Sequence, residues 1–173
     1  MQSLVTFPNF KPFKRTSGYD LYVFLKEDVE NILKNWHKEA QWKLMKVHKG
    51  KVIRKSGYHH TAIVRQKAPA PMREYFESTL LERPESLKTL YHGCGKDRKG
   101  RDLLAQHGAV SLYDPHHPVG MYGIIPNQIF DEIHSHYVLN VVTKDEGQQI
   151  MTEIYGRLSW KWGQAVVSVR RDL

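Results

Sequence analysis

The sequence places a glycine turn and a carboxylate where a nucleoside-binding site needs them. The predicted strand LKTLYH, residues 87–92, continues into Gly93, Cys94 and Gly95 and then into a predicted helix. Asp114 ends the next predicted strand, 19 residues after Gly95. Glycines let the backbone turn sharply and approach a ligand, and an acid at this position accepts hydrogen bonds from ribose hydroxyls. The order favours a nucleoside-binding half-fold, although a plain strand-to-helix turn would use the same glycines.

The turn departs from the dinucleotide-binding fingerprint G-x-G-x-x-G, because position 98 is Arg98. The charged residues that follow the turn are Lys96, Asp97, Arg98, Lys99 and Arg101. Their basic side chains could meet a phosphate group. They could equally mark an exposed helix start near a nucleic-acid face.

Alternating helices and strands must position these residues. Predicted helices cover residues 71–81 and 98–107, and a third helix begins at a capping box, Thr143 to Glu146. The predicted strands are residues 87–91, 109–113, 129–135 and 164–170. This alternation predicts an α/β fold with a mostly parallel sheet, in which ligands bind outside the carboxyl ends of the strands.

The first third of the chain carries the basic charge. Residues 1–67 hold 14 Lys and Arg against 5 Asp and Glu, whereas residues 68–173 hold 12 against 13. A long amphipathic helix is predicted over residues 27–47, with Lys34, Lys38 and Lys49 opposite its apolar stripe. A hairpin is predicted over residues 51–66.

This charge predicts a nucleic-acid or partner surface that includes Lys34, Lys38, Lys49 and Arg65. DNA or RNA is the expected partner, and an acidic protein is the alternative. The same lysines could also form an ordinary solvated surface.

Length and composition limit the class of protein. A chain of 173 residues suits one compact domain with its own core. A single cysteine excludes an internal disulfide framework. No apolar stretch reaches the roughly 18 residues that a membrane-spanning helix needs. We therefore expect a cytoplasmic protein with no membrane partner.

At the glycine turn the sequence becomes similar to a known family. The segment GCGKDRKGRDLLAQHGAVSLYDPHHP resembles the first two motifs of class I S-adenosylmethionine-dependent methyltransferases. More closely, residues 59–170 resemble the methyltransferases associated with DNA phosphorothioation gene clusters. The matching segments are His60 to Ile63 with Arg65, Tyr91 to Gly95, Asp114-Pro115, and the run Tyr137 to Val141.

The resemblance implies a Rossmann-like S-adenosylmethionine-binding domain over residues 58–173, preceded by a basic extension over residues 1–57. It implies S-adenosylmethionine as the cofactor. The residues expected to bind it are Tyr91, Gly93, Cys94, Gly95, Lys96, Asp114, Pro115 and His116.

The chain also departs from the family pattern. Tyr91 or His92 replaces the acid before the glycine turn, and Asp97 replaces a third glycine. The usual final antiparallel strands are expected to be missing, so we expect the hairpin at 51–66 to cover the exposed sheet edge. The short segment between Asp114 and Asp131 predicts an adenine pocket built from a compact loop around residues 121–124.

The ten histidines do not form a recognisable metal motif. His134 and His136 alternate on a predicted strand and could share a face, but no third ligand has a suitable spacing, so no metal is predicted. His136 and Tyr137 are predicted to lie beside the methyl group of the donor, where His136 could accept a proton. Cys94 is a poor candidate for a nucleophile, and Asn140 is expected to hold its turn through a side-chain-to-backbone hydrogen bond.

Two functions follow from these features. The first is an S-adenosylmethionine-dependent methyltransferase acting on nucleic acid or a nucleic-acid-associated target. The alternative is a non-catalytic nucleic-acid- or protein-binding module on a degenerate methyltransferase scaffold. An enzyme that degrades S-adenosylmethionine is a third possibility.

Overall fold

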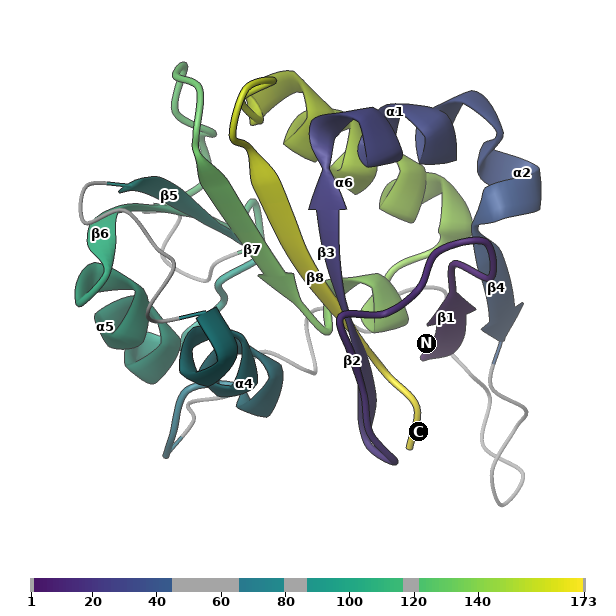
Figure 1. The fold of residues 1–173 in the computed structure, drawn as a ribbon, viewed down its shortest axis with the longest axis horizontal. Coiled ribbons are helices and arrows are strands. Elements are labelled where there is room, and N and C mark those ends of the chain that lie inside the picture. The colour runs from purple at the N-terminus through teal and green to yellow at the C-terminus, as the bar shows by residue number, and fades with distance from the viewer. Residues whose placement is uncertain (1, 45–65, 80–86, 117–121, 173) are drawn as a thin grey trace.

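A six-stranded sheet forms the centre of the computed structural model, which describes residues 2–44, 66–79, 87–116 and 122–172 (Figure 1). The strand order is β2-β3-β8-β7-β5-β6. The strands are β2 Lys14–Arg15, β3 Tyr19–Leu25, β5 Leu87–His92, β6 Gly108–Tyr113, β7 Glu132–His136 and β8 Gln164–Arg170. A separate small sheet pairs β1 (Ser3–Thr6) with β4 (Gln41–Leu44).

Four neighbouring strands, β6, β5, β7 and β8, are mutually parallel. The prediction of an α/β fold with a largely parallel sheet is therefore confirmed. The chain moves from β5 outward to β6, then returns to the other side of β5 to form β7. Strand order thus reverses between β5 and β7, which is where open α/β sheets form a ligand crevice.

The sheet continues beyond β8 into antiparallel strands, contrary to the expectation that such strands are missing. β3 pairs antiparallel with β8 along seven residues, from Tyr19 opposite Arg170 to Leu25 opposite Gln164. β2 then pairs antiparallel with β3. The N-terminal residues therefore complete the main sheet rather than form a separate extension, because β8 can bury its second edge against them. The predicted hairpin at 51–66 and the boundary at 57–58 lie outside the described residues, apart from residue 66.

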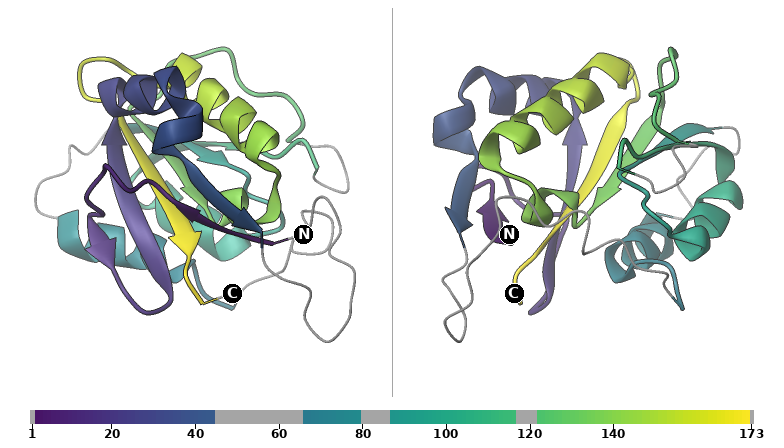
Figure 2. Two further views of the ribbon diagram at one scale, coloured as in Figure 1. Left: turned by 90° about the vertical axis from the view of Figure 1, so that its right-hand side faces the viewer. Right: turned by 180° about the vertical axis from the view of Figure 1, so that it is seen from behind.

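Helices cover both faces of the sheet (Figure 2). α4 (Ala70–Thr79) and α5 (Arg98–Ala105) pack on one face, and α1 (Lys26–Lys34) and α6 (Lys144–Arg157) pack on the other. Adjacent strand residues divide between the two faces, because side chains alternate along a strand. In β5, Leu90 joins the core under α1 and α6, whereas Tyr91 joins the core under α4 and α5.

The predicted helix over 27–47 is wrong in its extent. α1 ends at Lys34, the short helix α2 covers Trp36–Glu39, and β4 follows. Asn35 breaks the helix with φ −127° and ψ 46°, and asparagine is a poor helix former because its side chain competes for backbone hydrogen bonds. Part of the predicted apolar stripe is still buried, since Val29, Ile32 and Trp36 are 0–2% exposed, whereas Leu44 in β4 is 55% exposed.

The break in this helix divides the expected basic face between two helices. Lys34 and Lys38 lie on different helices, and Lys34 forms an ion pair with Glu30 at 3.0 Å. Within α1 the three acids Glu27, Asp28 and Glu30 outnumber the two lysines. Of the basic excess in residues 1–67, six cations and no acids fall in residues 45–65, outside the described residues together with Lys49 and Arg65.

The predicted capping box is present at α6. Glu146 N–H donates to Thr143 Oγ1, and Thr143 N–H donates to Glu146 Oε1. The strand before it is shorter than predicted, because β7 begins at Glu132 and residues 129–131 lie outside it. The turn between β7 and α6 contains a short 3-10 helix, η2 (Val138–Val141).

Asn140 in η2 connects three elements. Its Nδ2 donates to the carbonyls of Ser3 in β1 and Arg170 in β8, at 2.8 and 3.5 Å, and its Oδ1 accepts from Arg170 N–H at 2.8 Å. The expected side-chain-to-backbone bonding is confirmed, but the partners are in other strands rather than in its own turn. The side chain is 1% exposed, so water cannot replace these bonds.

We expect Asn140→Ala to lower the free energy of unfolding by about 2 kcal/mol, because it leaves buried backbone groups of β1 and β8 without partners. Denaturant unfolding measures the change. Thr152→Ala is the matched control, since Thr152 donates to Gln148 on the exposed side of α6 and its loss should cost about 0.5 kcal/mol or less. Equal effects of the two substitutions would contradict the bridging role of Asn140.

Candidate functional site

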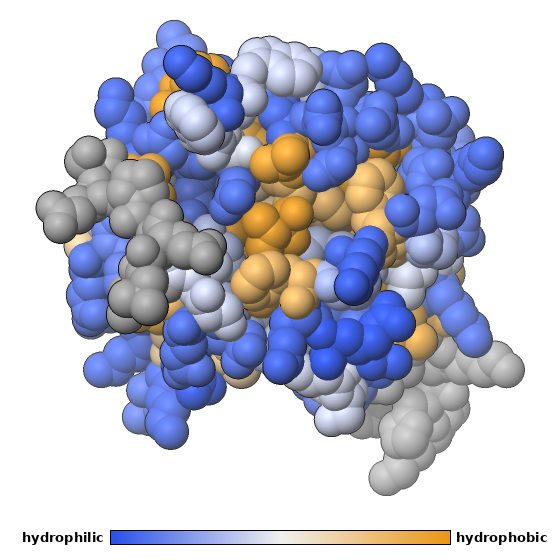
Figure 3. Space-filling model, in the orientation of Figure 1, coloured by the Kyte–Doolittle hydropathy of each residue, from blue (hydrophilic) through white to orange (hydrophobic). Residues whose placement is uncertain are grey.

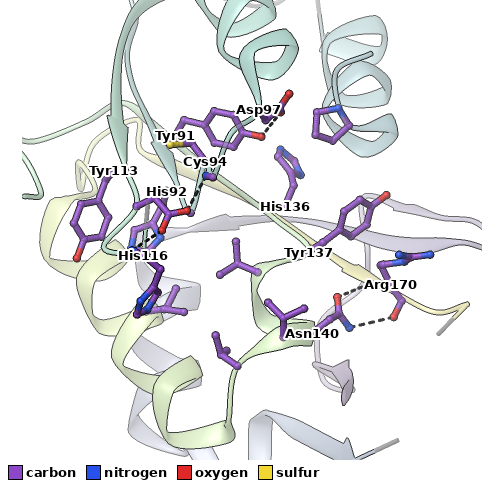
Figure 4. A pocket seen from close by; sticks show the side chains of 18 of the residues that line it. Tyr91, His92, Cys94, Asp97, Tyr113, His116, His136, Tyr137, Asn140 and Arg170 are labelled. Carbon is purple, nitrogen blue, oxygen red and sulfur yellow. Dashed lines mark hydrogen bonds between the residues drawn. The ribbon is translucent and has the colours of Figure 1, made fainter. Parts of the chain in front are cut away.

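A cavity of about 880 Å³ opens at the carboxyl ends of the parallel strands (Figure 4). Its walls come from the residues that end β5, β6, β7 and β8, from η2, and from one face of α6. This is the edge of the sheet where strand order reverses, so the cavity occupies the expected ligand crevice.

All ten residues that were predicted to bind the cofactor or to lie where the methyl group reacts line this cavity. They are Tyr91, Gly93, Cys94, Gly95, Lys96, Asp114, Pro115, His116, His136 and Tyr137. Lys34 and Lys38 do not line it. Met121 lies outside the described residues, and of the adjoining loop, residues 122–124, none lines the cavity.

The glycine turn has a backbone that other residues adopt poorly. Gly93 has φ 73° and Gly95 has φ 53°, both in the left-handed region. A Cβ atom at Gly93 would also clash with the Val138 side chain. Gly93 N–H donates to the Tyr113 carbonyl at 2.7 Å, which ties the turn to the end of β6. The turn can therefore approach η2 closely only with glycine at this position.

Asp114 fixes the turn from the other side. Its Oδ2 accepts from Gly95 N–H at 2.7 Å, and its Oδ1 accepts from His116 N–H at 2.8 Å. Each carboxylate oxygen has two lone pairs, so the half-buried side chain retains acceptor capacity toward the cavity. Asp114 is thus positioned both to hold the loop and to accept hydrogen bonds from a ligand hydroxyl.

Asp97, which replaces the expected third glycine, caps α5. Its Oδ1 accepts from Gly100 N–H at 3.0 Å, and its Oδ2 accepts from the Tyr91 hydroxyl at 2.6 Å. In dinucleotide-binding folds this helix N-terminus receives the pyrophosphate. Here a buried carboxylate occupies that position and would repel a phosphate group.

The cavity is acidic, although the chain carries a formal charge of +8. Among the described residues that line it are five carboxylates and two fixed cations; the carboxylates are Asp97, Asp114, Glu146, Glu153 and Asp172, and the cations are Lys96 and Arg170. The neighbouring acids favour the protonated form of Tyr113, as expected from their negative charge. Burial, with the charges of Glu153 and Asp114, raises the pKa of Tyr113.

His92 and Glu153 form a pair that sequence analysis missed. His92 Nε2 lies 2.7 Å from Glu153 Oε2, and His92 is 2% exposed. His92 Nδ1 is buried without a hydrogen-bond partner among the described residues. Glu146, Gln149 and Glu153 share one face of α6, a polar spacing that in a sequence indicates solvent exposure rather than a cavity wall.

Behind His136, a hydrogen-bonded chain extends into the core along β7. Glu132 Oε1 lies 2.6 Å from His134 Nε2, and His134 Nδ1 lies 3.0 Å from His136 Nε2. His136 Nδ1 in turn lies 2.8 Å from Ser168 Oγ. The prediction that His134 and His136 share a face is confirmed. Glu132 was missed, although its i−2 position puts it on the same face.

These hydrogen bonds bear on the predicted role of His136. Both ring nitrogens already have protein partners, so proton exchange with a ligand would require one of these bonds to be replaced. His136 nevertheless lines the cavity between Tyr91 and Tyr137 (Figure 4). Its role as a proton acceptor stays a prediction.

Tyr137 stands at the carboxyl end of β7 in a strained conformation. Its φ of 65° makes it the one non-glycine residue with positive φ among the described residues, and such outliers concentrate at functional sites. Its N–H donates to the Ser168 carbonyl at 2.9 Å, and the Arg170 guanidinium lies 5.8 Å from the centre of its ring. These contacts hold the aromatic ring at the cavity wall.

Comparison with protein-family models, curated proteins and solved structures gave no match. In the part of the chain that the structure describes, no group of three or more His, Cys, Asp or Glu side chains could hold a metal ion. No helix of the described segments is long and apolar enough to span a bilayer.

Cys94 is buried in the glycine turn, and we expect it to be unreactive. Burial, with a smaller effect from Asp114, raises the pKa of its thiol to about 12, so the thiolate fraction at pH 8 is roughly one in ten thousand. Iodoacetamide should therefore label native protein at pH 8 at least about a thousandfold more slowly than denatured protein. Because the chain has one cysteine, the labelling reports this site alone.

The raised pKa also predicts a pH dependence of stability. The folded state keeps the thiol protonated above the unfolded pKa of about 8.5, so its contribution is complete below that pH and declines as pH rises toward 12. Rapid labelling of the native protein at pH 8 would contradict the buried environment of Cys94.

Proposed function

We propose that this chain binds S-adenosylmethionine in the cavity and is a methyltransferase acting on nucleic acid or a nucleic-acid-associated target. The observation that carries the proposal is Asp114, which lies at the end of β6 and bonds the glycine turn that ends β5. This pair of features, at the point where strand order reverses, is the arrangement that receives a nucleoside in α/β sheets.

The charge of the cavity supports this ligand over a phosphate-bearing cofactor. S-adenosylmethionine carries a sulfonium and an ammonium group against one carboxylate, so it is cationic overall. An excess of carboxylates attracts such a ligand, whereas the Asp97 carboxylate at the N-terminus of α5 opposes a phosphate. The same charges disfavour NAD and ATP.

The residues present fit the parts of this cofactor. Asp114 would accept hydrogen bonds from the ribose hydroxyls, and the turn from Gly93 to Gly95 allows close approach of the backbone. Glu153, oriented by His92, offers a carboxylate from α6. When bound, S-adenosylmethionine supplies a methyl group on a positively charged sulfur.

The chain's own contribution is mainly positional. Many methyl transfers need the acceptor held in line with the donor and little acid–base help. Tyr137 and His136 form the wall at the end of β7, next to the glycine turn, and would exclude water and orient an acceptor there. The buried partners of His136 fix its ring in one orientation.

A second candidate is a non-catalytic binding module on the same scaffold. One observation favours it: both nitrogens of His136, the predicted proton acceptor, are held by protein groups. An acceptor atom that must lose a proton would then find no ready base at this position.

Titration calorimetry with S-adenosylmethionine tests the proposal through Asp114. In the Asp114→Asn variant we expect affinity to fall at least about tenfold, because charge-assisted hydrogen bonds are worth roughly 1.5–3 kcal/mol. Asp114→Ala should have a larger effect and also lower the melting temperature, because it removes the acceptor for Gly95 N–H. Unmodified protein should bind NAD and ATP more weakly than S-adenosylmethionine.

Asp102→Asn is the matched control, since Asp102 is an exposed carboxylate of α5 outside the cavity. It should change the affinity less than twofold. Full-strength binding by Asp114→Asn would refute the assigned site. No binding of S-adenosylmethionine or S-adenosylhomocysteine by unmodified protein would refute the methyltransferase and favour the non-catalytic module.

A further inference from the structure

Around the acidic cavity, exposed arginines form one side of a basic rim. Arg15 in β2 and Arg171 after β8 both face the buried carboxylate of Asp20, at 2.7 and 3.9 Å. Arg171 also bonds the turn between β2 and β3, where its N–H donates to the carbonyl of Gly18, a cavity-lining residue. Two guanidinium groups on one carboxylate leave a net positive charge beside the cavity.

The other side of the rim follows the glycine turn. Lys96 lines the cavity, and Arg98 and Lys99 are exposed in the first turn of α5. Asp97, the one acid among them, is 7% exposed and bonded to Gly100 and Tyr91. Its charge is therefore turned inward, and the outer surface keeps the three cations.

Two aromatic rings, those of Tyr19 and Tyr137, line the same cavity beside Arg170. Tyr19 of β3 is directly opposite Arg170 of β8, and directly opposed residues of antiparallel strands present their side chains on the same face. The Arg170 guanidinium also lies over the Tyr137 ring, and all three residues line the cavity. Arg170 is 44% exposed and its ion pair with Asp172 is equally open, so a phosphate could compete for it.

We infer that this rim, formed by Arg15, Arg98, Lys99, Arg170 and Arg171 with Tyr19 and Tyr137, binds single-stranded nucleic acid. Cations that follow a backbone, combined with rings that stack on bases, are the features of sequence-tolerant single-strand binding. The acidic cavity excludes the phosphates, so a strand on the rim can direct only a base inward. This inference rests on the proposed function and identifies the partner class and its docking surface.

The location differs from the one predicted from the sequence. α1 follows β3, which runs antiparallel to β8, so α1 begins at the end of the sheet opposite the carboxyl ends of the parallel strands (Figure 1). Lys34 there is already paired with Glu30. In the orientation of Figure 1, a hydrophobic patch lies near the centre of the visible face and mainly hydrophilic side chains surround it (Figure 3).

Fluorescence anisotropy with a labelled single-stranded DNA or RNA oligonucleotide, titrated at several salt concentrations, tests the surface. The double variant R98E/K99E should lose about tenfold in affinity, and the slope of log affinity against log salt should flatten by about 0.7 for each phosphate that is no longer neutralised. The matched control K34E/K38E makes the same change of charge on α1 and α2, away from the cavity. It should bind within about twofold of the unmodified chain.

A second pair of variants tests stacking. Tyr19→Phe keeps the ring and should bind normally, whereas Tyr19→Leu should lose up to about tenfold without changing the salt slope. Circular dichroism checks that each variant is folded. A loss with Tyr19→Phe equal to that with Tyr19→Leu would overturn the stacking role.

Any of three outcomes would overturn the inferred docking surface. The unmodified chain binds neither oligonucleotide, R98E/K99E and K34E/K38E lose equal affinity, or a polyglutamate peptide binds more tightly than the oligonucleotides. The last would identify an acidic protein partner. Calorimetry with S-adenosylmethionine is measured on unmodified protein alone. If the protein binds S-adenosylmethionine but no oligonucleotide, the proposed cofactor site stands and the inferred docking surface is wrong.

Discussion

The hydrogen bond from Gly95 N–H to Asp114 joins the two loops on which the cavity depends. It connects the turn after β5 with the end of β6, and the same carboxylate orients His116 through its backbone. Both glycines can adopt left-handed backbone, so the turn can fold back toward η2 and bring Gly93 against Val138. The positions of Tyr91, at the end of β5, and of the cap on α5 follow from this turn.

Charge is separated within a small molecule. Five carboxylates and two cations among the described residues line the cavity, whereas the exposed cations Arg98, Lys99 and Arg171 do not line it. The separation has a structural cause, because Asp97 is buried as a helix cap and Glu153 is turned inward toward His92. A cationic ligand inside and a polyanion outside are the partners that this distribution favours.

The buried chain along β7 places polar groups where a core strand normally carries apolar ones. Glu132, His134 and His136 are at most 6% exposed, and each satisfies the next. The Tyr75 hydroxyl of α4 donates to Glu132 at 2.7 Å, so the inner end of this hydrogen-bonded series is also satisfied. Fully bonded networks of this kind specify one arrangement of a core, since any shift would leave a buried group unpaired.

The sequence by itself determined the elements with local signals. The turn at Gly93 to Gly95, the capping box at Thr143 and the strand QAVVSVR at 164–170 each depend on neighbouring residues, and the structure has all three. It also placed Asp114 and the glycines together. Only the tertiary structure decided that Tyr19–Leu25 complete the sheet against β8, that the helix after Lys26 stops at Asn35, and that Glu153 faces His92. The first and third features join residues that are far apart in the chain. The second depends on whether helix formation or tertiary packing is more favourable after Lys34. The periodic pattern of apolar residues along the sequence reports neither long-range contacts nor that balance.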